Sequence, residues 1–359
     1  MLLIGFPTKD SIMINSASQI PFHTPAVSSS SAAARPVISA QELTTDLDIS
    51  AALDEAINDA IARGNEQAPA LAANLLRMVN ENPEALDLYL VNVSEQRQRN
   101  LTSALSITAY ASANAADSSS DALGRFGKVL ETVGKRNDEA NGKTLGTYTK
   151  YMVALTELAT KINSLIYADP KDAGKSVVNS NQIIDAVKAF CETWGAKTDA
   201  NGNDVNVLGV FSDKSAADKE AERFRGGTVE VFPDKRDNKF KLRFSFTKLI
   251  PIINALVNDK GTGETAKKIT QGMREGKGPD VSTLTEKEWS DWGYLKKNGV
   301  NAHGVQTITL ALSDVQKTHQ TDLDLVLNEF TRQTSQFDNL VKLFSSLATT
   351  MTETLKSFL

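Results

Sequence analysis

The sequence predicts a mainly α protein: a long antiparallel intramolecular coiled coil with an N-terminal helical hairpin and a small inserted α/β domain. The first observation is an apolar stripe with three- and four-residue steps along residues 303–358. The second is the same spacing in residues 145–166. The third is the alternation of apolar and polar side chains in residues 239–246, which is the two-residue period of a half-buried strand. Aromatic residues make up only 6% of the 359 residues, which favours an elongated helical protein over a β sandwich.

The C-terminal stripe is the longest predicted element. At about 1.5 Å per residue it spans roughly 80 Å, so it needs a packing partner along its whole length. His319 and Gln333 are polar positions within this coiled-coil seam, of the kind that sets register. A pH switch is the alternative role for His319, because imidazole titrates near neutrality. The large apolar side chains of the seam include Phe330, Phe337, Leu340, Phe344 and Leu347.

Residues 145–166 are the predicted intramolecular partner of this seam. Met152, Leu155 and Ile162 recur there at the spacing that places them on one helix face. We assign residues 120–197 and 300–359 together to the central coiled coil.

The N-terminal part is predicted to contain a disordered segment followed by a hairpin. Residues 1–40 are rich in Ser, Ala and Pro without a sustained period, and we assign them as a disordered export region. Residues 41–119 are assigned as the helical hairpin, with a first helix that ends at Gly64. Pro69 and Pro83 are each predicted to restart a helix. Such a hairpin buries little alone, so we expect it to pack on another part of the chain.

Residues 198–299 are predicted to form the inserted mixed α/β domain. Two strands, 228–232 and 239–246, are joined by a turn that contains Pro and Asn. A short helix follows over residues 248–257. The Gly- and charge-rich segment 258–280 is expected to be a mobile loop.

No catalytic or metal-binding motif is recognisable, so we predict a non-enzymatic protein without a cofactor or metal. The three histidines are scattered, and no HExxH motif, nucleophile elbow or separated carboxylate pair is present. Residues 174–176 resemble the end of a phosphate-binding loop and residues 199–203 the start of a calcium loop, but each lacks required positions. Cys191 lies in an apolar helical run, which predicts a buried, inert thiol. Trp289 and Trp292 are expected to be core or interface anchors.

Charge and hydropathy exclude further classes of function. The formal charge is −5 with both signs interspersed, and no Lys/Arg cluster alternates with aromatic residues, so nucleic acid is not an expected partner. No apolar segment reaches the roughly 18 residues that a membrane span needs. Residues 1–6 lack the basic start and the length of a Sec signal peptide, so export would use another route.

The C-terminal end carries a distinctive motif. It consists of SQFDNLVKLFSSL at residues 335–347 and LKSFL at residues 355–359. Together with YTKY at residues 148–151 and the order of the predicted units, this motif resembles the type III secretion needle-tip proteins of the invasion plasmid antigen D family. The resemblance covers nearly the whole chain. The longer Gly-rich segment 258–280 departs from it, as do the glycines of the first long helix, Gly134, Gly142 and Gly146.

The resemblance implies an exported virulence protein that caps a secretion needle, controls secretion and helps to assemble the translocation pore at the host membrane. In that family a small homo-oligomer forms at the needle tip, on the bacterial surface, after secretion by the type III route. The lower coiled coil engages the needle subunit, and the upper surface recruits a hydrophobic translocator protein. The hairpin acts as an internal chaperone that covers the assembly surface. Several members bind bile salts, which makes bile salts a candidate ligand here.

We expect needle contact from the polar residues of the motif that lie off the seam. A solvated helix face is the alternative reading of these residues. A self-polymerising, flagellin-like filament subunit is the alternative function, and it predicts unlimited self-association where a tip protein forms a small closed assembly. The expected needle-contact residues are Asp338, Asn339, Lys342, Ser345 and Ser346, with Lys356 nearer the chain end.

Overall fold

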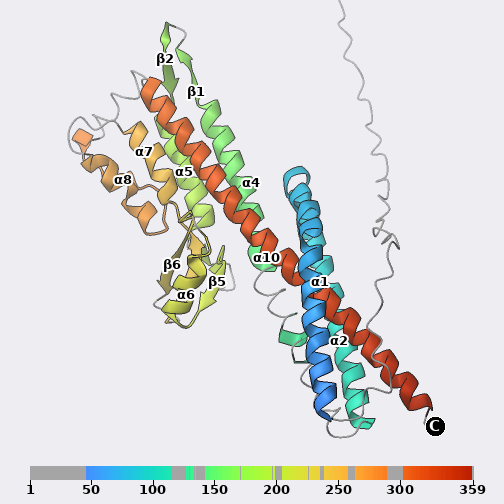
Figure 1. Ribbon diagram of the computed structural model, residues 1–359. Helices are drawn as coiled ribbons and strands as arrows, with labels where there is room; N and C mark the ends of the chain where they lie inside the picture. Colours follow the sequence, from blue (N-terminus) through green and yellow to red (C-terminus); the bar gives the residue numbers. More distant parts are fainter. Residues whose placement is uncertain are drawn as a thin grey trace, which may run out of the picture. The chain divides into compact units, whose positions relative to one another are not determined.

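The computed structural model describes part of the chain, which is mostly helical with small antiparallel sheets. The predicted export region 1–40 lies outside the described residues, as do Trp289 and Trp292. Several of the helices contact one long helix, α10 (Figure 1). The described residues are 46–114, 127–128, 130–132, 134, 142–169, 171–195, 197–198, 204–224, 226–234, 238–257, 263–288 and 302–357.

Helix α10, Ala302–Ser357, carries the apolar stripe that the sequence predicts. Its buried side chains recur in steps of three and four residues, as a helix with one covered face requires. Leu347, near the end of the stripe, is half-buried. The buried positions include Ile308, Leu312, Val315, His319, Leu323, Val326, Phe330, Gln333, Phe337, Leu340 and Phe344.

Helix α4, Lys143–Ser164, packs beside the N-terminal part of α10 (Figure 1). Met152, Leu155 and Ile162 are buried in α4, as predicted. However, α4 has 22 residues and α10 has 56, so α4 covers less than half of the seam. The C-terminal half of α10 has other partners, which the predicted pairing with residues 145–166 does not include.

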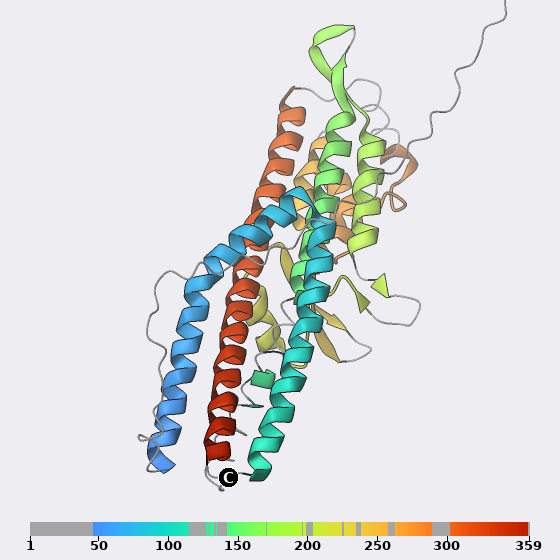
Figure 2. The ribbon, with the colours of Figure 1, turned by 90° about the vertical axis from the view of Figure 1, so that its right-hand side faces the viewer.

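Those partners are the two arms of the N-terminal hairpin, α1, Asp46–Glu81, and α2, Pro83–Asn114. Both arms contact α10, and Figure 2 shows them on opposite sides of its C-terminal half. The expectation that the hairpin packs on another part of the chain is therefore confirmed.

The start of α2 was predicted correctly from the sequence, but the end of the first helix was not. Helix α2 starts at Pro83 as predicted, and Asn82 Oδ1 accepts a hydrogen bond from Ala85 N at 3.1 Å. Helix α1, in contrast, continues through Gly64 and Pro69, so the predicted end and restart there are wrong. A proline inside a helix removes one backbone hydrogen bond, and α1 is visibly bent (Figure 2).

A three-stranded antiparallel sheet forms part of the inserted region. Its strands are β5, Gly209–Phe211, β6, Val229–Asp234, and β7, Lys239–Phe244, in the order β5-β7-β6. The register pairs Val231 with Leu242. The predicted hairpin is therefore confirmed, with strands at 229–234 and 239–244 in place of 228–232 and 239–246. The prediction that its second strand is half-buried is wrong, because the polar residues Lys241 and Arg243 are buried together with Leu242 and Phe244.

The remaining elements were only partly predicted. Two short antiparallel ladders were not expected: β1, Ile166–Asp169, with β2, Asp172–Val178, and β3, Lys197–Thr198, with β4, Asp204–Val205. The segment 258–280 was expected to be a loop but contains a helix, α8, which follows Gly263 in the left-handed region at φ 63°. The helices are α5, Ser180–Trp194, α6, Lys214–Ala221, η2, Thr247–Leu249, α7, Ile250–Leu256, and α8, Glu264–Arg274.

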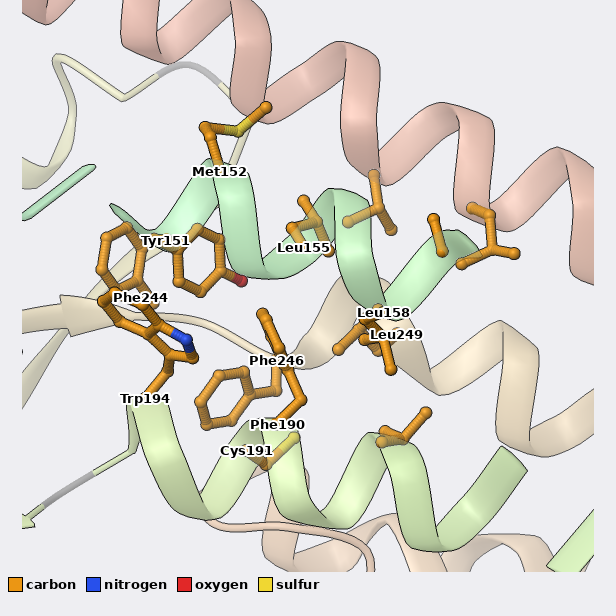
Figure 3. Packing of buried hydrophobic residues seen from close by; sticks show 14 of the residues in the cluster. Tyr151, Met152, Leu155, Leu158, Phe190, Cys191, Trp194, Phe244, Phe246 and Leu249 are labelled. Carbon is orange, nitrogen blue, oxygen red and sulfur yellow. The ribbon is translucent and has the colours of Figure 1, made fainter. Parts of the chain in front are cut away.

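Aromatic side chains from α4, α5 and β7 pack together in the main core (Figure 3). The rings of Tyr151 and Phe244 stack with their centroids 3.8 Å apart, and Trp194 meets both rings edge-on. Cys191 is buried beside them, as predicted, and burial raises the pKa of its thiol. These contacts fix the inserted sheet against α4 and α5.

Candidate functional site

Residues 330–344 of α10, here called the covered segment, include most of the C-terminal motif. Much of this segment is buried, including polar side chains that an amphipathic surface helix would expose. The buried polar residues are Thr331, Gln333, Thr334, Ser335 and Asn339. The covered segment is therefore enclosed by neighbouring elements on more than its apolar face.

Helix α1 contacts the covered segment through small and amide side chains. A Cβ on Gly64 would lie 2.6 Å from both the Cα and the N of Gln336, so glycine is needed for this backbone approach. Gln336 Nε2 donates a hydrogen bond to Asn65 Oδ1 at 2.9 Å, and Asn339 Nδ2 donates one to Gln67 Oε1 at 3.3 Å. The helix–helix contact is thus close and polar around one crossing point.

Helix α2 contacts the covered segment through a buried cation. The side chain of Arg97 is only 3% exposed, and its Nη2 donates a hydrogen bond to Thr334 Oγ1 at 2.6 Å. The guanidinium carbon lies 5.4 Å from the ring centroid of Phe330 and 5.8 Å from that of Phe337. These distances are within the range of cation–π attraction.

An apolar cluster lies beyond the Arg97 contact, toward the C-terminal end of α10. Phe337, Leu340 and Phe344 of α10 pack there with Ala60 of α1 and Leu101 of α2. Leu130 belongs to the same cluster, and a Cβ on Gly134 would lie 2.9 Å from Cε2 of Phe337. The hairpin, Leu130 and Gly134 together cover the apolar side of this half of α10.

The predicted needle-contact residues divide into two groups. Asp338, Lys342, Ser345 and Ser346 are exposed with the hairpin in place. Asn339 is only 8% exposed and bonded to Gln67, so its expected outward position is wrong. Its place beneath α1 follows from the crossing at Gly64, which no helical pattern within α10 indicates. The structure describes the backbone of Lys356, which belongs to α10, but not its side chain.

The environment of Asp338 links the motif to α2. Although this side chain reaches the surface, burial by the surrounding protein raises its pKa, and the positive charges of Arg97 and Lys342 oppose that rise. Burial also raises the pKa of Tyr89 on α2, with the charge of Arg97 opposing it and that of Asp338 adding to it. Arg97, Tyr89 and Asp338 therefore share one electrostatic environment.

A second polar cluster connects the N-terminal half of α10 with its neighbours. The Tyr148 hydroxyl lies 2.9 Å from His319 Nδ1 and 3.3 Å from Thr228 Oγ1, and Thr228 donates a hydrogen bond to Asp322. Tyr151 OH lies 3.4 Å from His319 Nε2. Burial lowers the pKa of His319 to about 3, with a smaller contribution from the charge of Lys248. The imidazole is thus neutral near pH 7 and connects α10 with α4, while Tyr148 and Asp322 extend the cluster to Thr228, the residue before β6.

An open groove of about 1210 Å³ lies between α5, α8 and residues 275–283. Lysines and carboxylates line it in similar numbers, and several of them form ion pairs with one another or, for Lys268, with the nearby Glu288. Nζ–Oε distances are 2.8 Å for Lys267 with Glu264, 2.7 Å for Lys268 with Glu288 and 3.0 Å for Lys277 with Glu275. A balanced set of surface ion pairs selects neither anions nor cations.

No protein-family model and no curated protein matches the chain. Within the described ranges, no group of three or more His, Cys, Asp and Glu side chains is arranged to hold a metal ion. Among the helices that the structure describes, none is both long enough and apolar enough to cross a membrane.

Arg97 is the site residue that sequence reasoning missed. It occupies the position midway between Val93 and Leu101, four residues from each, on the face that also carries Leu86 and Leu90. A charged residue within an apolar stripe is the signal that could have identified it. Its burial against two phenylalanines of α10 depends on a contact 237 residues along the chain.

Proposed function

We propose that the chain is a non-enzymatic tip protein that caps a type III secretion needle, controls secretion and helps to assemble the translocation pore. The observation that carries the proposal is the covering of the C-terminal motif by the N-terminal hairpin. The motif is the part of the chain whose sequence resembles the needle-tip family. A segment that must bind a partner after export needs protection before it, and the hairpin supplies that protection.

The chemistry of the cover supports an exchangeable contact. This interface combines its apolar cluster with a glycine crossing, amide pairs and a buried arginine, whereas the interior of a permanent core is dominated by apolar side chains. Amide and guanidinium groups regain hydrogen bonds with water when they are exposed, so opening costs less than it would for an all-apolar contact. The covered segment is therefore suited to changing partners.

The architecture extends the proposal to the whole helix. In this proposal, α4 and the N-terminal half of α10 form one part of a long antiparallel coiled coil. The hairpin occupies the C-terminal half of α10 until the needle subunit replaces it. The exposed residues Asp338, Lys342, Ser345 and Ser346 make first contact with the needle, Lys356 adds to it near the chain end, and Asn339 becomes available after α1 leaves. The upper surface recruits a hydrophobic translocator, and a small closed homo-oligomer assembles at the needle tip on the bacterial surface. Bile salts are a candidate ligand.

Charge reversal tests the contact residues. Asp338→Lys and Lys342→Glu should each weaken binding to the cognate needle subunit, because each reverses an exposed charge in the motif. Lys317→Glu, an exposed position on the upper part of the same helix, is the matched control and should bind normally. Far-UV circular dichroism should be unchanged in all three variants. Unaltered pull-down of the needle subunit by both motif variants would remove these residues from the interface.

Sedimentation distinguishes the proposal from a self-polymerising filament subunit. A tip protein should sediment as a small species alone at all accessible concentrations and should join a heavier species only when needles are added. Filament subunits instead grow without limit by themselves, because a head-to-tail contact that does not close continues indefinitely.

A further inference from the structure

Buried apolar side chains along α10 belong to two separate clusters. The main core contains α10 residues as far as Phe330, and a small cluster begins at Phe337. Residues 331–336, which lie between them, are all polar. Within this stretch Thr334 bonds to α2 and Gln336 bonds to α1. A polar layer therefore separates the small cluster from the main core.

Helix α1 divides between the two clusters in the same way. Ala60 belongs to the small cluster, and Ile57 packs against it. Ala72 and Leu75 belong to the main core. The close crossing with α10 at Gly64 lies between these two groups. The two halves of α1 are thus held by different sets of contacts.

Pro69 interrupts α1 between the same two groups. Because proline has no N–H, residue 69 cannot donate the helical hydrogen bond to the Asn65 carbonyl. The Asn65 side chain accepts the hydrogen bond from Gln336, so the interruption adjoins the polar layer. Pro69 itself is exposed, and α1 is bent (Figure 2). Helix α2 contains neither glycine nor proline after Pro83, so α1 is the arm with a weak point in its backbone.

We propose that residues 46–68 of α1 form a lid that swings away from the covered segment about a hinge at Pro69, while residues 70–81 stay packed against the main core. This movement breaks the contacts of the lid with the small cluster and the polar layer. The polar groups of that layer regain hydrogen bonds with water when the lid opens. The main-core contacts keep the lid attached, so it closes again on the same site. The use of this movement to admit the needle subunit rests on the proposed function, whereas the movement itself does not.

Thiol labelling of the full-length chain measures the movement. Each variant places one thiol at a buried alanine, in a background of Cys191→Ser. The variants are Ala60→Cys in the lid, Ala72→Cys in the rest of α1 and Ala159→Cys in α4, where the alanines are 6%, 8% and 4% exposed. Without denaturant, the thiol of Ala60→Cys should react with a small disulfide reagent at least about tenfold faster than the other two, because only the lid has to move. If Ala60→Cys does not fold, Ala68→Cys, at a 7% exposed alanine of the lid, replaces it.

Pro69→Ala, added to Ala60→Cys, tests the hinge. Alanine restores the N–H and joins the two halves of α1 into one continuous helix, so the lid no longer moves without residues 70–81. The labelling of Ala60→Cys should therefore slow about tenfold, toward the rate of Ala72→Cys. A proline that served only as a fixed bend would have the opposite effect, because a straightened α1 would lose its crossing with α10. Pro83→Ala is the matched control: at a first helical position no hydrogen bond is gained, so labelling should not change.

The labelling and binding outcomes separate the hinged lid from the proposed function. Equal labelling of Ala60→Cys and Ala72→Cys would overturn the lid, and unchanged or faster labelling on adding Pro69→Ala would overturn the hinge. In a chain whose only change is Pro69→Ala, association with the needle subunit should be several-fold slower than in the wild type. Slower labelling without slower needle association would uphold the hinged lid and contradict the proposed function.

Discussion

Gly64 of α1 faces the backbone of Gln336 of α10 so closely that a Cβ at position 64 would lie 2.6 Å from the Gln336 Cα. This crossing brings Asn65 and Gln67 within hydrogen-bond distance of α10. The same glycine therefore sets both the separation of the helices and the alignment of their amide groups.

Gly64→Ala should detach or displace α1. A methyl group cannot be accommodated against backbone atoms, and overpacking of this kind costs about 1–3 kcal/mol or more of unfolding free energy. Urea unfolding and exchange of α1 amides measure the effect. Gly146→Ala is the matched control in α4: its Cβ would lie 3.4 Å from the end of the Leu90 side chain, which can move. That control should be neutral or stabilising by up to about 1 kcal/mol through helix propensity. Equal stability of the two variants would contradict the close crossing.

Acid should destabilise the upper part of the molecule through His319. Its pKa is lowered to about 3 in the folded chain because it is buried, against an ordinary value near 6.5. The unfolded chain therefore binds the proton first, so the contribution is complete above pH 6.5 and is lost as the pH falls toward 3. At pH 5 the loss should be about 2 kcal/mol.

The pH dependence of urea unfolding measures this loss. His319→Gln should flatten the dependence between pH 6.5 and pH 4, whatever its effect on stability at pH 7. His303→Gln, at an exposed position near the start of α10, is the matched control for the loss of an imidazole. A His319→Gln profile as steep as that of the wild type would show that the imidazole is not held neutral.

A buried ion cluster should stabilise the inserted sheet. Lys241, which is 2% exposed, forms ion pairs with Asp204 and Asp234, and Arg243 Nη2 lies 3.1 Å from Asp204 Oδ1. Asp204→Asn removes the charge shared by both cations and should cost roughly 3 kcal/mol. Asp218→Asn breaks an exposed pair with Lys214 and should cost less than about 1 kcal/mol. Thermal unfolding of the two variants decides the point, and similar melting temperatures would contradict the account.

Periodicity made much of the fold predictable. The apolar stripe of α10 depends on a local repeat, and the structure buries its residues as the repeat requires. The alternation in β7 correctly predicted a strand, but the strand is buried on both faces, because Lys241 and Arg243 are covered as well. Local signals were misleading where packing overrides them. Gly64 and Pro69 resemble the end of one helix and the start of another, yet α1 continues because its contacts with α10 offset the cost of an interior proline. The high content of charged residues and glycine in segment 258–280 likewise led to the prediction of a loop where the structure has α8.

The candidate site was less predictable, because burial in it is decided by distant contacts. Four of the motif residues are exposed as expected, but Asn339 lies beneath Gln67, 272 residues earlier in the chain. Arg97 was missed because a charge within an apolar stripe has no meaning until its partner surface is known. Helical periodicity specifies which face of one helix is apolar, and it does not specify which polar residues a second helix will cover.

Locking the hairpin shut tests whether it is an exchangeable cover of the proposed needle-binding segment. A full-length chain with Asn65→Cys and Gln336→Cys, in a Cys191→Ser background, can be joined by a short bis-maleimide across the observed contact between these side chains, neither of which belongs to the expected needle-contact set. The linked protein should lose binding to the needle subunit in a pull-down, whereas the same protein blocked with a monofunctional maleimide should retain it. Equal needle binding by the linked and blocked proteins would contradict the account.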